Sequence, residues 1–376
     1  MSSTQLRGIT WDHVRGYGPL EASVPIYREK TGIQIQWDKR SLKDFGDVSL
    51  DFLAQEYDLI IMDHPHCGTA SATRCIIPLD EILDQDKLEE AASNSVGPSF
   101  ISYFYNNHQW ALPIDAACQV SCRRMDLMEG ILLPQSWSDV FKLGDLMRPR
   151  GLFIGAALCP TDCNCSFLTL CAQLGDPVQE DKFTTVATGT EALHVLQTLY
   201  AICHPKSSTW NPVSLYDHMS TKNDVAYSPL AFGYTNYSRK GYSNKRLAFG
   251  TIPGYDNAIL GGAGIAVSSF SKVPHEAAEY AAWLCDENYQ STTYVETGGQ
   301  PACKHAWTNE AVNKLTSGFF SETRSTIESA YVRPRNLKWP LFQETLGDII
   351  HDSLIRNKST HQTWAAIINA YSQYYP

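Results

Sequence analysis

The sequence predicts an α/β fold of two lobes with a cleft between them and a helical C-terminal tail. The chain has 376 residues, which is too long for a single small hydrophobic core. Strand and helix patterns alternate over the first 63 residues, and a second alternating unit begins near residue 151. From residue 273 onward the patterns are almost entirely helical.

The first unit reads strand, helix, strand, helix, strand. The first helix pattern has a proline near its start and a glycine at its end, which are typical of helix termini. Strands joined in this way run parallel with right-handed crossovers. The predicted elements are strands at 6–11, 33–37 and 57–63 and helices at 19–32 and 49–56.

The second unit follows a predicted hairpin that turns at Asn106–Asn107. Its first strand, 151–160, leads into a helix that begins near Thr161. Two glycine-rich segments near its end are expected to pair with each other as strands. The remaining predicted elements are helices at 189–204 and 211–220, a strand at 224–234, and the strand pair 246–254 and 258–271.

This order inserts the second lobe into the first. Two crossings between lobes, near 112–116 and 257–264, would form a hinge. Lobe 1 is predicted to comprise residues 1–112 and 264–315, and lobe 2 residues 116–257 and 316–376.

Composition and charge argue against several classes of partner. The formal net charge is −10, and no run of lysine and arginine forms a basic surface, so we expect no nucleic-acid partner. No apolar run approaches the roughly 18–20 residues that cross a bilayer. The first residues lack the pattern of a signal peptide, and the eleven cysteines are an odd, scattered set. These features predict a cytoplasmic protein with reduced thiols. We expect it to be a monomer or dimer.

Polar side chains gather where the strands of the first unit end. In open α/β sheets, ligands bind beyond the carboxyl ends of the strands. Asp12 and Asp63 could instead cap the following helices, and His66 could be a partly buried structural histidine. The predicted rim residues are Trp11, Asp12, His13, Arg15 and Tyr17 after the first strand and Asp63, His64 and His66 after the third.

Three further candidates come from the rest of the chain. Tyr227 and Tyr234 flank an apolar strand, and tyrosines stack on sugar rings while their hydroxyls hydrogen-bond. Arg333 could hold a carboxylate or phosphate. For each of them the alternative is an ordinary structural role, in the core for the tyrosines or in a surface ion pair for the arginine.

The sequence predicts no cofactor and no resident metal. Asp63, His64 and His66, with His13 or His108, offer suitable donors, but their spacing does not enforce a metal geometry. The four cysteines between residues 159 and 171 lack Cys-x2-Cys pairing and are better explained as small apolar residues of a helix. No nucleotide-binding glycine loop or serine nucleophile motif is present.

Several motifs together resemble the family 1 solute-binding proteins of ABC transporters, which are maltose-binding-protein-like and have a type II periplasmic-binding fold. The motifs are "WALPIDAACQ", "LGGAGIAVSSFSK", "HEAAEYAAWLCDE" and "TGGQPACKHAW". The stretches "GITWDHVRGYGPL" and "YVRPR" are similar to a sub-branch whose members often lack signal peptides.

The resemblance implies a ligand held between lobes that close by a hinge. It places Trp11, Asp12, His13, Asp63, His64, Asp115, Tyr227, Tyr234 and Arg333 along that cleft. The chain departs from the parent family in its missing export signal and its many cysteines, which argues against an ABC permease as partner.

Two functions are compatible with these residues. The first is binding of a small polar or anionic ligand, such as a sugar or organic acid, without chemical change. The alternative is an intracellular lyase, isomerase or cyclase on the same scaffold. In that case Asp12, His13, Asp63, His64 and Asp115 would supply proton transfer and Arg333 would hold an anionic group.

Overall fold

The computed structural model describes residues 4–41, 49–254 and 257–376, which form two compact units. Residues 1–3 and 42–48 of the predicted lobe 1 and residues 255–256 of the predicted lobe 2 lie outside the described residues. The chain passes from unit 1 to unit 2 within strand β7 and returns within strand β11. Unit 1 comprises Met1–Ala117, Gly261–Leu315 and Arg335–Leu337, and unit 2 comprises Cys118–Leu260, Thr316–Pro334 and Lys338–Pro376.

Unit 1 contains a mixed sheet with the strand order β2-β1-β3-β11. The first three strands run parallel, as the sequence predicts, because each is joined to the next through a helix. Strand β11 is antiparallel to β3, and the short β4 pairs with β11. The strands are β1 (Gln5–Trp11), β2 (Gln34–Arg40), β3 (Leu59–Met62), β4 (Ile76–Ile77) and β11 (Leu260–Ser268).

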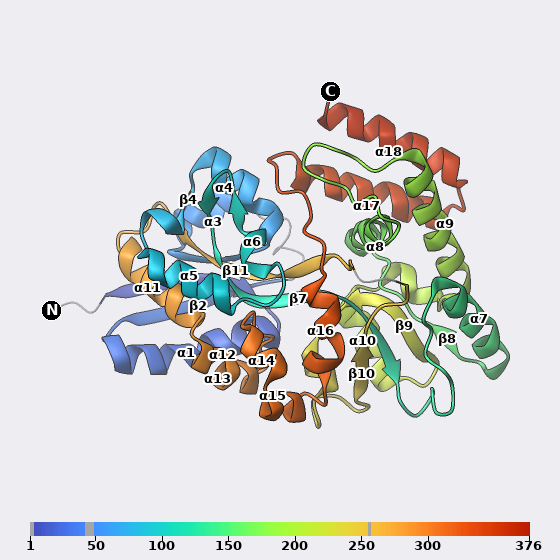
Figure 1. The fold of residues 1–376 in the computed structure, drawn as a ribbon, viewed down its shortest axis with the longest axis horizontal. Helices are drawn as coiled ribbons and strands as arrows, with labels where there is room; N and C mark the ends of the chain where they lie inside the picture. Colours follow the sequence, from blue (N-terminus) through green and yellow to red (C-terminus); the bar gives the residue numbers. More distant parts are fainter. Residues whose placement is uncertain (1–3, 42–48, 255–256) are drawn as a thin grey trace. The chain divides into compact units, whose positions relative to one another are not determined.

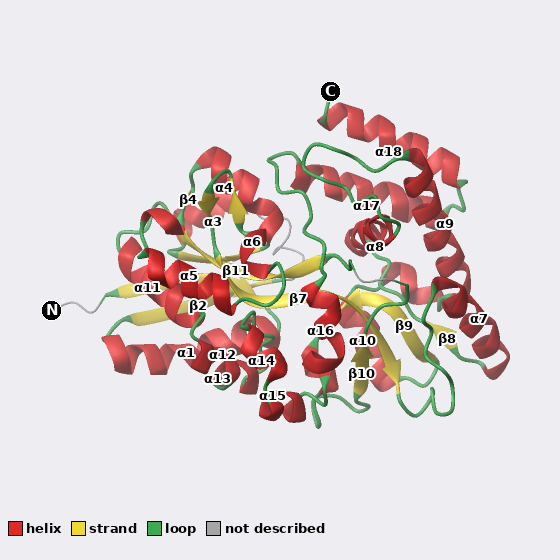
Figure 2. Cartoon of the chain, viewed as in Figure 1, coloured by secondary structure: helices red, strands yellow, loops and turns green. Residues whose placement is uncertain are grey.

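Helices flank this sheet in unit 1 (Figures 1 and 2). Two of them match predicted segments, and a hairpin of β5 (Phe104–Tyr105) and β6 (His108–Gln109) turns at the predicted asparagines, both at positive φ. The unit 1 helices are α1 (Val14–Thr31), α3 (Leu50–Glu56), η1 (His64–His66), α4 (Cys67–Thr73), η2 (Leu79–Glu81), α5 (Gln85–Asn94), α6 (Ser99–Ser102), α11 (Pro274–Leu284), α12 (Glu287–Ser291), α13 (Thr293–Glu296), α14 (Lys304–Thr308) and α15 (Glu310–Leu315).

Helix α1 begins five residues earlier than the sequence predicts. His13 is its N-cap, and the His13 side chain accepts a hydrogen bond from the backbone N–H of Arg15 at 3.1 Å. Pro19 therefore lies inside the helix, not at its start, and Gly32 ends the helix in the left-handed conformation as expected.

Unit 2 contains a second sheet with the order β7-β9-β8, and β10 pairs with β7 on its other side. The expected pairing of 246–254 with 258–271 is wrong: β10 is antiparallel to β7, whereas β11 pairs with β3 and β4. Strands β10 and β11 each pair with a strand that is distant in the sequence instead of with each other. The strands are β7 (Leu112–Arg124), β8 (Phe153–Ile154), β9 (Val225–Phe232) and β10 (Leu247–Gly250).

Helices α8 and α17 pack against each other in unit 2. A Cβ atom at Gly347 of α17 would lie 2.3 Å from the backbone oxygen of Pro160 in α8, so only glycine permits this approach. The unit 2 helices are α7 (Trp137–Met147), η3 (Arg148–Arg150), α8 (Pro160–Gln173), α9 (Val186–Ile202), η4 (Pro205–Thr209), α10 (Pro212–Thr221), η5 (Thr235–Ser238), α16 (Phe319–Glu328), α17 (Trp339–Ile355) and α18 (Thr360–Tyr374).

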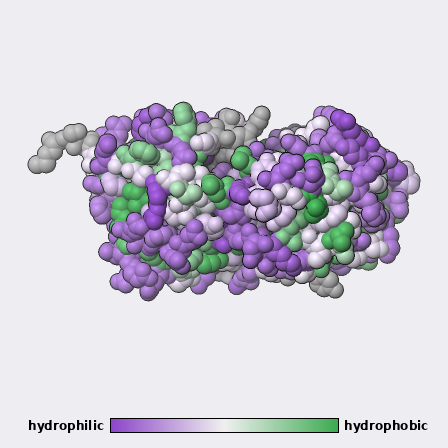
Figure 3. Space-filling model, turned by 90° about the horizontal axis from the view of Figure 1, so that it is seen from above, coloured by the Kyte–Doolittle hydropathy of each residue, from purple (hydrophilic) through white to green (hydrophobic). Residues whose placement is uncertain are grey.

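The structure confirms the interpretation of the clustered cysteines. Cys163, Cys165 and Cys171 are buried thiols along α8, and all eleven cysteines are free. On the face shown in Figure 3, hydrophilic residues predominate and hydrophobic ones form small separate patches. Within the described ranges, we find no helix with the length and apolar character of a membrane span.

Candidate functional site

The carboxyl ends of β1, β2 and β3 bring polar groups to one edge of the unit 1 sheet. Asp12 directly follows β1, and its backbone N–H donates to the carbonyl of Arg40, the last residue of β2, at 2.7 Å. The Arg40 guanidinium in turn donates to the carbonyl of Ile61 in β3 at 2.9 Å. Asp63 directly follows β3. Asp12, Arg40 and Asp63 thus lie on neighbouring strand ends, as the sequence predicts for the two aspartates.

Asp12 is exposed, and the residue that caps α1 is His13. Asp12 is therefore not the cap of the following helix, which is the alternative role considered for it. Burial and the neighbouring Arg15 lower the pKa of His13 to about 4, so its ring is neutral at pH 7. Because Nδ1 accepts the helix N–H, the neutral ring carries its proton on Nε2.

Tyr17 lies half-buried on the first turns of α1. The ammonium of Lys39 sits 3.4 Å from the centre of the Tyr17 ring, and the same ammonium pairs with Glu21 at 2.8 Å. This arrangement fixes a cation on one face of the ring.

Arg15 and Asp115 form a buried ion pair. The Arg15 Nε donates to one Asp115 oxygen at 2.8 Å while an Nη atom donates to the other, and both side chains are at most 5% exposed. A bidentate pair in this position satisfies both charges internally. The sequence predicts that these two residues bind ligand. We instead interpret them as structural residues that hold the first turn of α1 against β7.

Trp11 is also largely buried, with 5% of its surface exposed. A Cβ atom at Gly16 would lie 2.4 Å from the Trp11 ring, so the ring packs directly onto the backbone of α1. Trp11 belongs to the main core of unit 1 together with Leu20 and Tyr294.

The segment after β3 combines a cap with a buried histidine. Asp63 accepts the backbone N–H of His64 at 2.8 Å, so the capping alternative applies to Asp63. The His64 Nδ1 lies 3.1 Å from the same carboxylate, and its ring is 1% exposed, edge-on to Tyr103. His66 is half-buried one residue before α4.

These residues do not form a metal-ligand group. Among the described residues, the group of three potential ligands whose donor atoms all lie within 4.8 Å of one another is in unit 2 and includes neither Asp63, His64 nor His66. His108 instead hydrogen-bonds Asp80 at 2.8 Å.

In unit 2, Tyr227 and Tyr234 differ in position. Tyr227 lies within β9, is 2% exposed, and burial raises its pKa well above the ordinary range. This placement is that of a core residue. Tyr234 is also buried, with 7% of its surface exposed, but it follows β9 at its carboxyl end, and its ring centre is 6.5 Å from that of Tyr216.

Arg333 is 5% exposed and donates to Gln343 at 3.4 Å. It lies two residues after Tyr331, whose backbone bridges Ile259. The structure thus gives Arg333 a partner within unit 2.

Asp162 is a residue that the sequence interpretation missed. It lies in the first turn of α8, is 5% exposed, and accepts a hydrogen bond from the Cys159 thiol at 3.0 Å. Burial raises the pKa of Asp162 to about 7. An aspartate near a helix start is normally taken as a solvated cap, and no pattern in the sequence shows that this one is buried.

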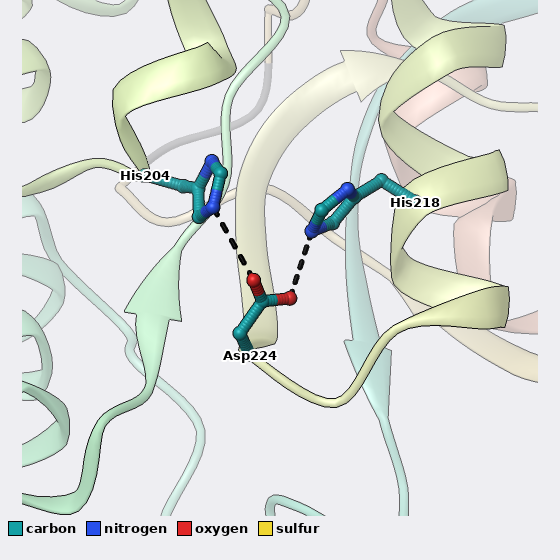
Figure 4. A group of neighbouring side chains, drawn as sticks. All are labelled: His204, His218 and Asp224. Atoms are coloured by element: carbon teal, nitrogen blue, oxygen red, sulfur yellow. Dashed lines mark hydrogen bonds and ion pairs between the residues drawn. The ribbon is translucent and has the colours of Figure 1, made fainter.

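A separate group of possible metal ligands lies in unit 2. The side chains of His204 and His218 both point at the carboxylate of Asp224 (Figure 4). Burial lowers the pKa of His204. Burial acts to raise the pKa of Asp224, but the hydrogen bond and charge of His218 hold it below the ordinary value.

Comparison with known proteins identifies the family. The model of the family described as bacterial extracellular solute-binding protein matches residues 22–317. Comparison with curated proteins gives no match.

Solved structures share the fold across the whole chain. Maltose-bound MalE3 of T. maritima has a TM-score of 0.84 at 16% identity, covering 99% of both chains. A solute-binding protein of Agrobacterium radiobacter K84 in complex with ribitol has a TM-score of 0.81 at 17% identity, covering 98% of both. The GacH receptor of Streptomyces glaucescens has a TM-score of 0.81 at 13% identity, covering 100% of this chain and 99% of that one.

These matches confirm the predicted α/β fold of maltose-binding-protein type. The family's description is extracellular, which differs from the cytoplasmic location that the cysteines predict. The chain belongs to the bacterial extracellular solute-binding protein family.

Proposed function

We propose that the protein binds a small polar solute of the sugar or polyol class and releases it chemically unchanged. Family membership supports binding as the activity. Structures that share the fold are described with maltose, ribitol, α-D-tagatose and D-mannitol, all of them polyhydroxylated.

The observation that carries the proposal is the polar edge of the unit 1 sheet. Asp12 and Asp63 offer carboxylate oxygens that accept hydrogen bonds, which sugar hydroxyls donate. The neutral His13 ring, next to Asp12 in the chain, adds an imidazole N–H donor without adding a net charge. Two carboxylates and one guanidinium, that of Arg40, lie at this edge, so its net charge is negative and an uncharged polyol fits it better than an organic acid does.

Unit 2 would supply the other half of the site. We expect the ligand to be held between the units, as the family resemblance implies, with a hinge near 112–116 and 257–264. Tyr234 supports this through its position at the carboxyl end of β9, where its ring is 7% exposed, so that a sugar would meet the exposed part of the ring.

The arrangement of charges favours binding over catalysis. A general acid or base must reach the reacting atom. Asp115 is held by Arg15 in a buried pair, and His64 is almost fully buried. Asp115 and His64, both predicted as catalytic residues, are therefore better explained as structural residues.

A thermal-shift panel of sugars, polyols and organic acids tests the proposal. A solute at about 100 times its dissociation constant should stabilise the folded protein by about 2.7 kcal/mol. Asp12→Asn should weaken the binding of that solute, whereas Glu90→Gln, an exposed carboxylate on α5, should not. Stabilisation by organic acids alone, or an Asp12→Asn variant that binds as the wild type does, would contradict the proposal.

We further propose a cytoplasmic location, supported by eleven free cysteines in one chain. Fractionation of the native cells with immunoblotting tests it. Recovery in the cytoplasmic fraction would also argue against an ABC permease as partner, because a permease meets its binding protein outside the cytoplasm.

A further inference from the structure

His204, His218 and Asp224 converge in unit 2. The His218 Nε2 lies 2.7 Å from one oxygen of the Asp224 carboxylate, and the His204 Nε2 lies 3.3 Å from the other. Figure 4 shows the two rings approaching the carboxylate from different sides. The three donor atoms all lie within 4.8 Å of one another.

Separate elements hold these three side chains in place. His204 precedes η4, His218 lies in the last turn of α10, and Asp224 directly precedes β9. The backbone carbonyl of Asp224 accepts the N–H of Phe153, and the carbonyl of Ile154 accepts that of His204, at 2.7 and 2.8 Å. The backbone is therefore anchored to strand β8 on both sides of the group.

An aromatic wall fixes the two imidazole rings. The Trp210 ring stacks on His204 at 4.9 Å and lies 4.6 Å from His218. The histidine side chains are 11% and 13% exposed, whereas that of Asp224 is 39% exposed. The group is thus rigid on the histidine side and open to solvent on the carboxylate side, so an ion can enter.

From this geometry we propose that His204 Nε2, His218 Nε2 and an Asp224 oxygen bind a divalent transition metal, Zn²⁺ above all. Two imidazoles and one carboxylate are a ligand set that zinc accepts, with water in the fourth position. Imidazole nitrogens favour Zn²⁺, Ni²⁺ and Cu²⁺ over the oxygen-seeking Mg²⁺ and Ca²⁺. Metal binding would fasten η4, α10 and β9 together.

The protons can be accounted for. In the metal-free protein the His204 Nδ1 accepts the N–H of Lys206 at 3.2 Å, so the neutral ring carries its proton on Nε2 and donates it to Asp224. Coordination through Nε2 moves that proton to Nδ1 and breaks the contact with Lys206. The His218 Nε2 proton, which faces Asp224 at 2.7 Å, moves to Nδ1 in the same way. Metal binding must therefore outweigh the two Asp–His contacts and the backbone hydrogen bond from Lys206.

The group of His204, His218 and Asp224 lies at the opposite end of β9 from Tyr234, the unit 2 residue proposed to contact the solute. Asp224 precedes β9, at the amino end of that strand, whereas Tyr234 follows its carboxyl end. The proposal therefore does not depend on the solute-binding function.

Titration of the chelator-treated full chain with Zn²⁺, followed by calorimetry, tests the proposal. We expect one Zn²⁺ per chain and a higher melting temperature. Asp224→Asn and His218→Gln should each lower the affinity at least about tenfold. Co²⁺ should give visible bands without an intense sulfur-to-cobalt band, which excludes binding to cysteine.

A matched control is available in unit 1, where Asp80 hydrogen-bonds His108 at 2.8 Å. Asp80→Asn removes an equivalent Asp–His contact and should leave Zn²⁺ binding unchanged. Nitrogen NMR of the histidine rings gives a measurement that a change in stability alone would not alter. On Zn²⁺ binding, the ring proton of His204 should transfer from Nε2 to Nδ1. No saturable binding at micromolar Zn²⁺, or equal binding by folded Asp224→Asn, would overturn the proposal.

Discussion

At the residue scale, the most informative difference between sequence and structure is the pairing of Arg15 with Asp115. The two residues are separated by 100 positions, and each looks like a ligand contact when considered alone. Together they neutralise each other inside unit 1. Sequence patterns identify reactive residue types at strand ends, but they do not reveal which charges pair over such a separation.

The pair predicts a large stability effect. Asp115→Asn should lower the free energy of unfolding by about 3–5 kcal/mol, because it leaves the Arg15 charge buried without a partner. Asp38→Asn, which breaks the exposed pair with Arg7, should cost less than about 1 kcal/mol. Urea unfolding followed by circular dichroism measures both. Equal effects of the two substitutions would show that the buried pair has no special role.

Asp162 predicts a pH dependence of stability. Its ordinary pKa is 3.8 and its folded pKa is about 7, so the folded state binds the proton more tightly. Between about pH 4 and pH 7, raising the pH should therefore lower the free energy of unfolding, by up to about 4 kcal/mol from this group.

Asp162→Asn isolates that contribution. The stability difference between variant and wild type should shift in favour of the variant as the pH rises from 4 to 7 and level off above it. Unfolding curves at several pH values measure the difference. A constant difference across this range would mean that Asp162 titrates normally.

At the element scale, the sequence predicts most of the secondary structure. The alternation of apolar runs and turn residues correctly indicates β1, β2, β3, α3 and the hairpin at Asn106–Asn107. Their order fixes the parallel pairing. The start of α1 is wrong because a histidine cap is not distinguishable from a reactive loop residue. The partner of β10 is wrong because sheet pairing over long separations leaves no local pattern.

Gly262 in strand β11 lies too close to the backbone of Asp115 to carry a side chain. Gly262 has φ +107°, and a Cβ there would lie 2.3 Å from the backbone oxygen of Asp115. Gly262→Ala should therefore cost more than the strain of positive φ alone, which is about 1 kcal/mol. Gly130→Ala is the matched control, since Gly130 has φ +73° and open space around it. Thermal melting of both variants gives the comparison, and equal losses would contradict a steric origin.

At the scale of the whole molecule, two compact units are joined through β7 and β11. The order of elements and the family motifs predict the maltose-binding-type fold from sequence alone. The ligand is not predictable in the same way, because hydrogen-bonding side chains at strand ends suit many polar solutes.

Hinge closure is a prediction for the whole chain. Binding of a solute between the units should draw them together, so the radius of gyration should fall when the solute is added. Small-angle X-ray scattering with and without the solute measures it. An unchanged radius at saturating solute would argue that binding involves one unit only.

The most direct test of the central claim is to incubate the protein with the solute that stabilises it and then recover that solute. Equilibrium dialysis measures how much is bound, and NMR of the recovered solute shows its structure. The account predicts one solute bound per chain and an unchanged spectrum after prolonged incubation. A new compound in the recovered material, whether isomer or cleavage product, would contradict it and establish an enzyme on this fold.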